Sequence, residues 1–446
     1  MKKKSLSLVM IGCMLASLLT GCGNSGTSET TTSAAEDNST KENSVSNTTD
    51  GDVVNLTMSF WGDVNESATK QALVDEFNKT HPNIHVEYTF TDGATYPTTL
   101  QTYFTSNTAP DIMNVAEDII YDFQKDGVFE NLKPYMEKDN LLDGVWEQDL
   151  TDQFTFGDSI ICAPHVYKIP AIAYNKDLFD EKGITYPDEN WTDEDFMNIA
   201  KQLTYGEGQD KVWGVHFSWF PASTARDMFN NPYYIKDENK MNVVGNDQFK
   251  TGLELFHKIF VEDQSAPNDT AFASVGGGFE TGKFGMAMVG AWEIDSMAKL
   301  IGDKFSWDVV RLPINSKYGR WRGINMCDGM AMSSKSENKE AAWEFIKWCT
   351  TDESAQKLSA PLGVPALSSY ANSEEYKSSY PDGVQKYDKS AFFSQPSETQ
   401  PWYNTGKLAK INDELGVDYE KYINGEMTID ELISDLDEKG KNIFAE

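Results

Sequence analysis

The chain has 446 residues, of which 24% are charged, and its formal net charge is −32. A protein this acidic is repelled by nucleic-acid phosphates and anionic lipid headgroups, so we expect neither a nucleic-acid partner nor a polyanionic ligand. His81 and His85 are separated by Pro82, and no H-E-x-x-H or G-x-S-x-G motif is present. The sequence therefore predicts no metal site, no cofactor and no hydrolase signature.

The N-terminus has the three parts of an export signal. Lys2, Lys3 and Lys4 precede an apolar run over 6–19, and small residues follow it. The run is shorter than the ~20 apolar residues that a membrane-spanning helix needs. We therefore predict a cleaved signal peptide over 1–21.

The segment Leu19-Thr20-Gly21-Cys22 resembles the bacterial lipobox. This resemblance implies a diacylglyceryl group on Cys22, and two acyl chains are about what stable membrane anchoring requires. The alternative is an ordinary signal peptide with an incidental cysteine. Residues 23–50 are almost entirely small, polar or acidic, so we predict that 22–52 is a disordered tether with a reach of roughly 30 Å.

The body that follows exceeds the ~250–300 residues at which single cores stop growing, which favours two lobes. Apolar and polar residues alternate over 54–60 and again over 84–90, as in strands, and a helix is predicted between them. A third strand is predicted at 112–115. Strand–helix–strand order is typical of a parallel α/β sheet.

Further helices and strands alternate through the rest of the body. Helices with apolar spacing i, i+3, i+4 and i+7 are predicted after Thr192 and Thr428, each with a capping box, and over 342–349. Short strands are predicted at three places: 171–174, 286–289 and 309–312. The fold class is therefore α/β.

The three cysteines of the body, Cys162, Cys327 and Cys349, lie in apolar surroundings without a C-x-x-C pair. We predict buried free thiols, with one disulfide plus a leftover cysteine as the alternative.

Two motifs fail on inspection. The glycine-rich stretch 277–283 matches a phosphate loop until Phe284 replaces the required hydroxyl, so a loop before a strand is predicted. Asp435 and Asp437 have the spacing of the first ligands in a calcium-binding loop, but Lys439 occupies the next ligand position. We predict instead a helix closed by Gly440.

Aromatic content points to a ligand class. Eleven tryptophans and nineteen tyrosines are present, and several lie beside turn residues. Aromatic rings stack on the apolar face of a sugar, while carboxylates and amides bond to its hydroxyls. A glycoside hydrolase is the alternative from another class, with Glu117/Asp118 or Glu293/Asp295 as carboxyl pairs, but neighbours on one loop seldom face a bond from opposite sides.

From Val53 onward the body resembles the family 1 extracellular solute-binding proteins, the maltose-binding-protein-like receptors of ABC sugar importers. The motifs that carry the resemblance occur in family order: Trp61-Gly62-Asp63, Ala109-Pro110-Asp111-Ile112-Met113, Asp126-Gly127-Val128-Phe129-Glu130-Asn131-Leu132, Ile172-Ala173-Tyr174-Asn175-Lys176-Asp177-Leu178-Phe179, Gly282-Lys283-Phe284-Gly285-Met286 with Gly290-Ala291-Trp292, and Ala341-Ala342-Trp343-Glu344-Phe345-Ile346-Lys347. After Pro110-Asp111 the sequence departs from the maltose-type pattern, because Asn114-Val115 stands in place of an aromatic residue.

The resemblance implies a two-lobed periplasmic-binding-protein-like fold of type II, with the ligand cleft between lobes joined by crossing segments. Carried onto this chain, the crossings lie near 163–168, 289–291 and 326–332. Lobe 1 would comprise 53–164 plus 291–328, and lobe 2 would comprise 165–290 plus 329–446.

The resemblance also implies ligand-binding residues in that cleft. They are Trp61, Asp63, Asp118, Tyr167, Trp292, Trp321, Arg322, Asp328 and Trp402, with His165 and Lys168 beside them on the first crossing.

The function implied is an extracellular receptor on a lipid anchor. It would bind a sugar or oligosaccharide as a monomer, close by hinge motion and dock on ABC permease subunits, without catalysis. The same fold binding a non-sugar solute is the remaining alternative.

Overall fold

The computed structural model describes residues 53–445 except 63, 94, 117–118, 121–122, 125, 218–233, 236–239, 323, 381–384, 394–399 and 402–405. The chain divides into two units, Met1–Asp50 and Gly51–Glu446, and all described residues belong to the second. The predicted signal peptide, Cys22 and the whole of the predicted tether therefore lie outside the described residues.

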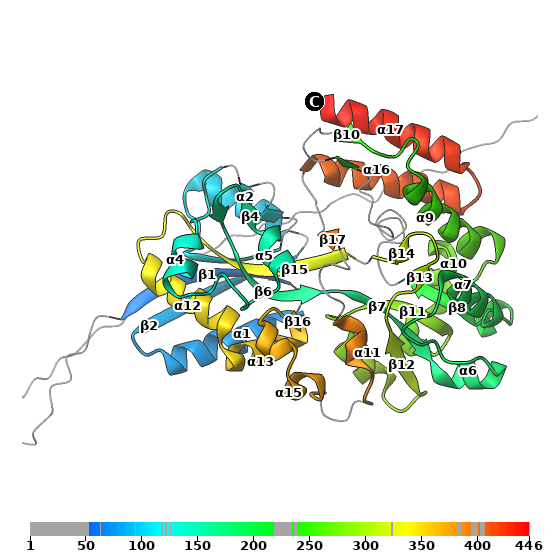
Figure 1. The fold of residues 1–446 in the computed structure, drawn as a ribbon, viewed down its shortest axis with the longest axis horizontal. Helices are drawn as coiled ribbons and strands as arrows, with labels where there is room; N and C mark the ends of the chain where they lie inside the picture. Colours follow the sequence, from blue (N-terminus) through cyan, green and yellow to red (C-terminus); the bar gives the residue numbers. More distant parts are fainter. Residues whose placement is uncertain are drawn as a thin grey trace, which may run out of the picture. The chain divides into compact units, whose positions relative to one another are not determined.

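The first lobe is built on a mixed sheet that has seven strands in the described part of the chain (Figure 1). The strands are β1 (Val54–Gly62), β2 (Ile84–Asp92), β3 (Ile112–Ala116), β6 (Ala163–Lys168), β15 (Ile324–Met332), β16 (Val364–Pro365) and β17 (Gln400–Pro401). β1 is parallel to β2 and β3, whereas β15 is antiparallel to β3 and β6. The predicted alternation is confirmed, since Leu56, Met58 and Phe60 are buried while Asn55 and Thr57 are exposed.

Helices pack on this sheet, among them the two predicted between β1 and β2 and over 342–349. They are α1 (Val64–Thr80), α2 (Tyr96–Ser106), α4 (Lys133–Lys138), α5 (Gln148–Gln153), α12 (Lys339–Thr351), α13 (Glu353–Ser359), α14 (Ser368–Ala371) and α15 (Glu374–Lys377), with a small hairpin of β4 (Thr155–Phe156) and β5 (Ser159–Ile160). Phe77 of α1 is fully buried and meets Phe345 of α12 edge-on, with ring centroids 4.8 Å apart. Helices distant in sequence therefore share one core.

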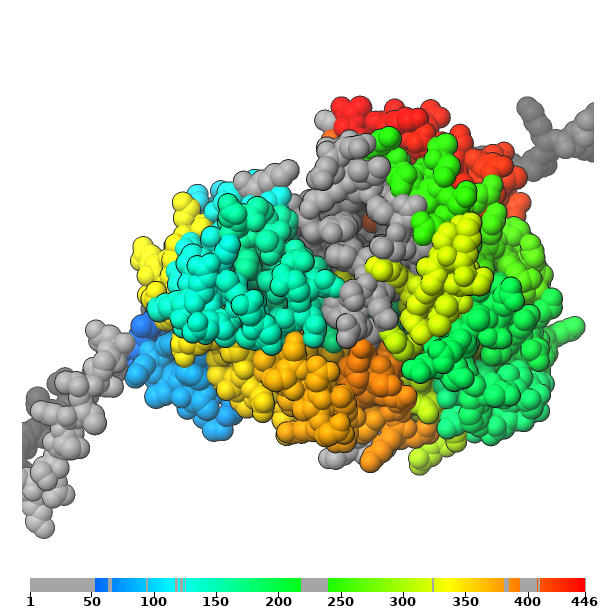
Figure 2. Space-filling view, viewed as in Figure 1, coloured from blue at the N-terminus to red at the C-terminus, as the bar shows by residue number. Residues whose placement is uncertain are grey.

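The second lobe is built on a four-stranded sheet with the order β12 (Trp307–Val310), β7 (Pro170–Asn175), β11 (Phe284–Gly290) and β8 (Trp213–Phe217). Around it lie α6 (Lys176–Lys182), α7 (Asp193–Gln202), α9 (Asp247–His257), α10 (Asp269–Val275), α11 (Ile294–Ile301), α16 (Gly406–Ile423) and α17 (Ile429–Ala445), and the short strands β9 (Tyr234–Ile235), β10 (Lys240–Met241), β13 (Ile314–Asn315) and β14 (Gly319–Arg320). In Figure 2, α17 (red) and the segment around α9 (green) lie side by side on the surface.

Chain crossings connect the two sheets. β6 and β7 lie end to end in Figure 1, with Ile169 alone between them. The carbonyl of Ile169 accepts a hydrogen bond from the Ala291 amide at 3.3 Å, so the second crossing, after β11, is tied to the first. A third lies between β14 and β15. The crossings predicted at 163–168 and 289–291 thus lie close to observed ones, while 326–332 lies within β15.

The sheets divide the chain differently from the predicted lobes at several points, as two examples illustrate. β12 falls in the segment assigned to lobe 1, yet it pairs with β7 in the second sheet. α12 and α13 fall in the segment assigned to lobe 2, yet α12 packs on α1 in the first lobe. The reason is that lobe membership depends on pairing between distant segments, which local apolar spacing does not encode.

The capping prediction at Thr192 is confirmed, because its side chain and that of Asp195 form a reciprocal capping box at the start of α7. Cys162, Cys327 and Cys349 are free and buried, as predicted. The helix end predicted at Gly440 is wrong, since α17 continues to Ala445. A side chain at position 440 would overlap Met241, so this glycine permits close packing of β10.

A charge network joins α16 to α17. Lys439 contacts Asp418 at 2.8 Å, Glu414 at 2.8 Å and Asp435 at 2.9 Å, and Asp418 is fully buried. Burial alone would raise the pKa of Asp418, but hydrogen bonds from Lys439 and Lys421 outweigh it and lower the pKa. The network therefore stabilises the helix pair while the carboxylate is ionised.

We expect Lys439→Met to lower the free energy of unfolding by about 2 kcal/mol, because it leaves a buried carboxylate with fewer cations. Urea unfolding followed by circular dichroism measures the change. Lys441→Met is the matched control on the same helix, because Lys441 is 72% exposed, and we expect a cost below about 1 kcal/mol. Equal stabilities of the two variants would contradict the role given to Lys439.

Candidate ligand-binding site

Three strands bring a group of polar side chains together where the first sheet leads into the second. Trp61 lies near the carboxyl end of β1, Lys168 ends β6, and Asp328 lies in β15 opposite Val166. In open α/β sheets, ligands bind outside the carboxyl ends of strands. We call Trp61, Lys70, His165, Lys168 and Asp328 the junction cluster.

An ion pair is the centre of the junction cluster. Lys168 Nζ lies 3.0 Å from Asp328 Oδ2, and the two side chains are only 6% and 2% exposed. Removing two charges from water costs several kcal/mol for each ion, which mutual attraction offsets only when the geometry is good. A buried ion pair is thus weak evidence for a stabilising role. It is consistent with a preorganised polar binding site.

The Trp61 ring lies against two ammonium groups. Lys70 Nζ is 4.8 Å and Lys168 Nζ 4.7 Å from the ring centroid, and Lys70 also donates to the Trp61 carbonyl. Ammonium groups this close to an indole are attracted by its π-electrons. The two lysines therefore fix the orientation of the ring and engage its π surface.

Four buried polar atoms at or beside this cluster have no hydrogen-bond partner within the described ranges. They are Trp61 Nε1, His165 Nδ1, Asn325 Oδ1 and Asp328 Oδ1. Buried polar groups are nearly always hydrogen-bonded, so such exceptions need an explanation. Trp61 Nε1 is a donor and the Asn325 and Asp328 oxygens are acceptors, which matches a ligand that carries hydroxyl groups, each of which both donates and accepts.

His165 is held neutral beside the lysines. Its Nε2 lies 2.8 Å from Ser359 Oγ, and the ring is 1% exposed. Burial, together with the charges of Lys70 and Lys168, lowers its pKa to about 3. His165 therefore adds no positive charge to the site at neutral pH.

Trp292 follows β11 at the second crossing and is half-buried. Its ring packs directly over Gly290, where a methyl group would overlap the indole. Position 290 must therefore lack a side chain for the ring to keep this orientation.

We expect Gly290→Ala to displace the Trp292 ring and to lower the free energy of unfolding by about 1–3 kcal/mol, the usual cost of overpacking. Tryptophan fluorescence and urea unfolding measure the two effects. Gly416→Ala is the control, because position 416 has open space around it. An unchanged emission spectrum for Gly290→Ala would show that the ring is not held this way.

The structure separates the other predicted residues from the junction cluster. Tyr167 is 6% exposed and packs within the first core. Trp321 is 2% exposed in the second core, edge-on to Phe196 with centroids 5.2 Å apart. Arg322 is partly buried; this burial lowers the pKa of its guanidinium, against the opposing effect of Asp149. Of the predicted residues, Trp61 and Asp328 are thus brought together, through Lys168.

Asp63, Asp118 and Trp402 lie outside the described residues, as does Glu117. Two residues near the site escaped sequence reasoning: Lys70 and Asn325. Lys70 precedes the buried Leu73 and Phe77 by three and seven positions. This helical spacing predicts that Lys70 lies on the apolar face of α1. Nothing in the sequence around Asn325 distinguishes it.

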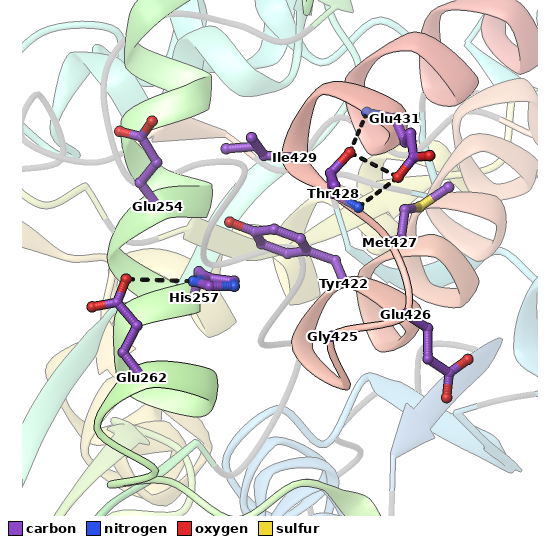
Figure 3. Close-up of a pocket in the computed structure, with 10 residues that line it drawn as sticks. All are labelled: Glu254, His257, Glu262, Tyr422, Gly425, Glu426, Met427, Thr428, Ile429 and Glu431. Carbon is purple, nitrogen blue, oxygen red and sulfur yellow. Dashed lines mark hydrogen bonds and ion pairs between the residues drawn. The ribbon is translucent and has the colours of Figure 1, made fainter.

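A surface pocket of about 430 Å³ lies elsewhere, where the turn between α16 and α17 meets α9 (Figure 3). Four glutamates line it, and Tyr422 lies beside His257 with ring centroids 5.0 Å apart. Glu431 is bound to Thr428 in a capping box. The pocket contains none of the predicted ligand-binding residues, and we assign no ligand to it.

Within the described ranges, no group of three or more His, Cys, Asp or Glu side chains has the arrangement of a metal site. None of the helices in that part of the chain is both long and apolar enough to cross a bilayer.

Two α/β lobes joined by crossings, with a buried polar cluster at the junction, define a two-lobed solute-binding protein. The chain belongs to the bacterial extracellular solute-binding protein family, whose sequence model matches residues 61–356.

Comparisons with known proteins agree with this family. An uncharacterized lipoprotein of Streptomyces antibioticus is 24% identical over 330 residues, which is 69% of this chain and 70% of the relative. The sugar-binding protein MalE of Xanthomonas citri superposes with a TM-score of 0.75 at 18% identity, over 88% of this chain and 98% of the other. An ABC substrate-binding protein of Listeria monocytogenes, solved with cycloalternan, superposes with a TM-score of 0.72 at 23% identity. The match covers 88% of this chain and 98% of the other. The structural likenesses establish the type II binding-protein fold.

Proposed function

We propose that this protein is the sugar-binding receptor of an ABC importer, and that it captures a saccharide outside the cytoplasmic membrane. The observation that carries the proposal is the junction cluster, in which Trp61 Nε1 and Asp328 Oδ1 are buried with no hydrogen-bond partner among the described residues. One structural neighbour is named a sugar-binding protein and the other was solved with cycloalternan, which supports the same ligand class.

The chemistry of the cluster suits a hydroxylated, neutral ligand. The indole N–H of Trp61 would donate to a ring or hydroxyl oxygen, and Asp328 Oδ1 would accept from a sugar hydroxyl. Trp292, half-buried at the second crossing, would supply a ring for the apolar C–H face of the sugar. Asp63, Asp118 and Trp402 remain proposed ligand residues on the resemblance alone.

Binding requires the lobes to move. Because the unpartnered atoms are fully buried, a ligand reaches them only when the lobes part at the crossings. The ligand would then shift the open–closed equilibrium towards the closed form, which docks on the permease. No bond is made or broken, and the receptor acts as a monomer.

The lipobox-like segment ending at Cys22 supports a lipid anchor on the outer side of the membrane. The anchor would keep the receptor near its transporter. Mass spectrometry of protein extracted from membranes tests this, with a lipidated N-terminal peptide beginning at Cys22 as the expected species. A mature chain that begins elsewhere would contradict it.

Isothermal titration calorimetry of the mature domain tests the ligand class. We expect one saccharide of a panel of mono- and oligosaccharides to bind at one equivalent, with intact saccharide recovered afterwards. A flat response to all sugars together with binding of a peptide or polyamine would contradict the proposal, and turnover of an oligosaccharide would favour a hydrolase.

A further inference from the structure

A second hollow, of about 410 Å³, lies on the first lobe at the C-terminal end of α2. Its wall includes Tyr103 and Phe104 of α2, and its polar lining includes Gln101, Asn107, Asp126 and Lys335. Its volume is within the ~300–1,000 Å³ range of small-molecule sites, near the lower end. We call it the α2 hollow.

The backbone around the α2 hollow is held firmly. Ser334 donates from its amide to the Val128 carbonyl at 2.9 Å and from its hydroxyl to the Gly127 carbonyl at 2.7 Å. Asn107 ends α2 in a left-handed conformation with φ of 55°. Phe104 is fixed edge-on against Phe123 and Phe129. The rim is therefore preformed.

The side chains that line the hollow contrast with their neighbours. Elsewhere on α2, the hydroxyls of Thr99 and Thr102, which do not line the hollow, bond back to helix carbonyls at 3.1 and 2.9 Å. The Tyr103 phenol, the Asp126 carboxylate and the Lys335 ammonium make no hydrogen bond or ion pair to any described residue. The Tyr103 ring likewise has no stacking partner in that part of the chain.

This combination has the composition of a carbohydrate site. The half-buried Tyr103 ring at the wall provides a surface for sugar C–H groups, and an amide, a carboxylate and an ammonium provide donors and acceptors for hydroxyls. One acid and one base leave the lining without a strong net charge, which favours a neutral ligand. The chemistry thus matches that proposed for the junction cluster.

The two sites lie at opposite ends of the same strands. The hollow includes Ala109, before β3 begins, and Ser333, after β15 ends. Asp328 pairs with Ala116 at the other end of β3, four residues from the Met332–Ile112 pair. At about 3.3 Å per residue this separates them by at least roughly 13 Å along the strands. A ligand in the hollow is therefore distinct from one at the junction.

We propose that the α2 hollow is a second saccharide-binding site, which holds a sugar unit weakly while the junction site binds tightly. The inference rests on the proposed sugar-receptor function. A second contact would retain an oligosaccharide near the receptor by raising its local concentration.

Saturation-transfer NMR with maltotriose, cellotriose and xylotriose tests the second site in the Asp328→Asn background, where binding at the junction site is weakened, and Tyr103→Ala then separates the two sites. We expect at least one of these trisaccharides to bind with a Kd on the order of 1 mM. Adding Tyr103→Ala should weaken this binding at least tenfold, whereas Thr98→Ala, on the same helix, should leave it unchanged. Melting curves establish that each variant is folded.

The outcomes separate the two proposals. Absence of weak binding in Asp328→Asn, or weak binding that Tyr103→Ala does not change, would overturn the second site. In the chain without Asp328→Asn, Tyr103→Ala should leave tight saccharide binding unchanged. The sugar-receptor function would instead be contradicted if the natural chain binds no saccharide tightly. It would also be contradicted if Asp328→Asn leaves tight saccharide binding unchanged.

Discussion

Replacing Asp328 by asparagine should weaken saccharide binding by about 10- to 100-fold, because a hydrogen bond to a charged group contributes about 1.5–3 kcal/mol. The substitution preserves shape but removes the carboxylate that Lys168 contacts at 3.0 Å. Breaking a buried ion pair from one side typically costs about 3–5 kcal/mol of stability. Calorimetric titration and urea unfolding of the same preparation measure both losses.

Glu340→Gln is the matched control for Asp328→Asn. Glu340 also pairs with a lysine, Lys138 at 3.1 Å, but the two side chains are 74% and 64% exposed. Exposed pairs contribute roughly 0–1 kcal/mol, so neither stability nor affinity should change appreciably. An Asp328→Asn protein that unfolds and binds like the natural chain would contradict the role given to the junction cluster.

Acid should destabilise the protein through two buried histidines. Burial lowers the pKa of His165 to about 3, with Lys70 and Lys168 adding to the effect, and burial lowers the pKa of His216 to about 4 against the opposing charge of Glu280. An unfolded histidine has a pKa near 6.5, so below that pH the unfolded chain binds protons that the folded chain does not. Stability is therefore fully present above pH ~6.5 and decreases as the pH falls towards 4.

Each histidine should contribute about 1.4 kcal/mol per pH unit in that window. Urea unfolding at intervals between pH 7.5 and 4.5 measures the slope. His165→Gln, which keeps a side-chain amide near Ser359, should remove about half of it, and His216→Gln about the other half. A free energy of unfolding that is constant from pH 7.5 to 5 would contradict the assignment of two buried neutral histidines.

Local pattern predicted much of the secondary structure. The alternation over 54–60 and 84–90 appears as β1 and β2, and the box at Thr192 starts α7. These features depend on residues that are close in sequence, so they can be predicted without knowing the fold. The prediction at Gly440 shows the limit, because that glycine serves contact with Met241 in a distant strand.

The binding site was harder to predict because it depends on which strands pair and on which face of the sheet each side chain lies. Trp61 and Asp328 come together through β1, β6 and β15, whose pairing spans most of the chain. Tyr167 differs from Lys168 by one position, yet it faces the core. Trp321 follows a turn, where an exposed ring is plausible, but it fills the second core. Aromatic content indicated a ligand class without selecting the rings.

A crystal structure of the complex with the saccharide that binds in calorimetry tests the central claim most directly. The account predicts sugar oxygens within hydrogen-bond distance of Trp61 Nε1 and Asp328 Oδ1, with the Trp292 ring against a sugar face. A saccharide bound elsewhere, with these atoms still unpartnered, would contradict the assignment of the junction cluster as the binding site.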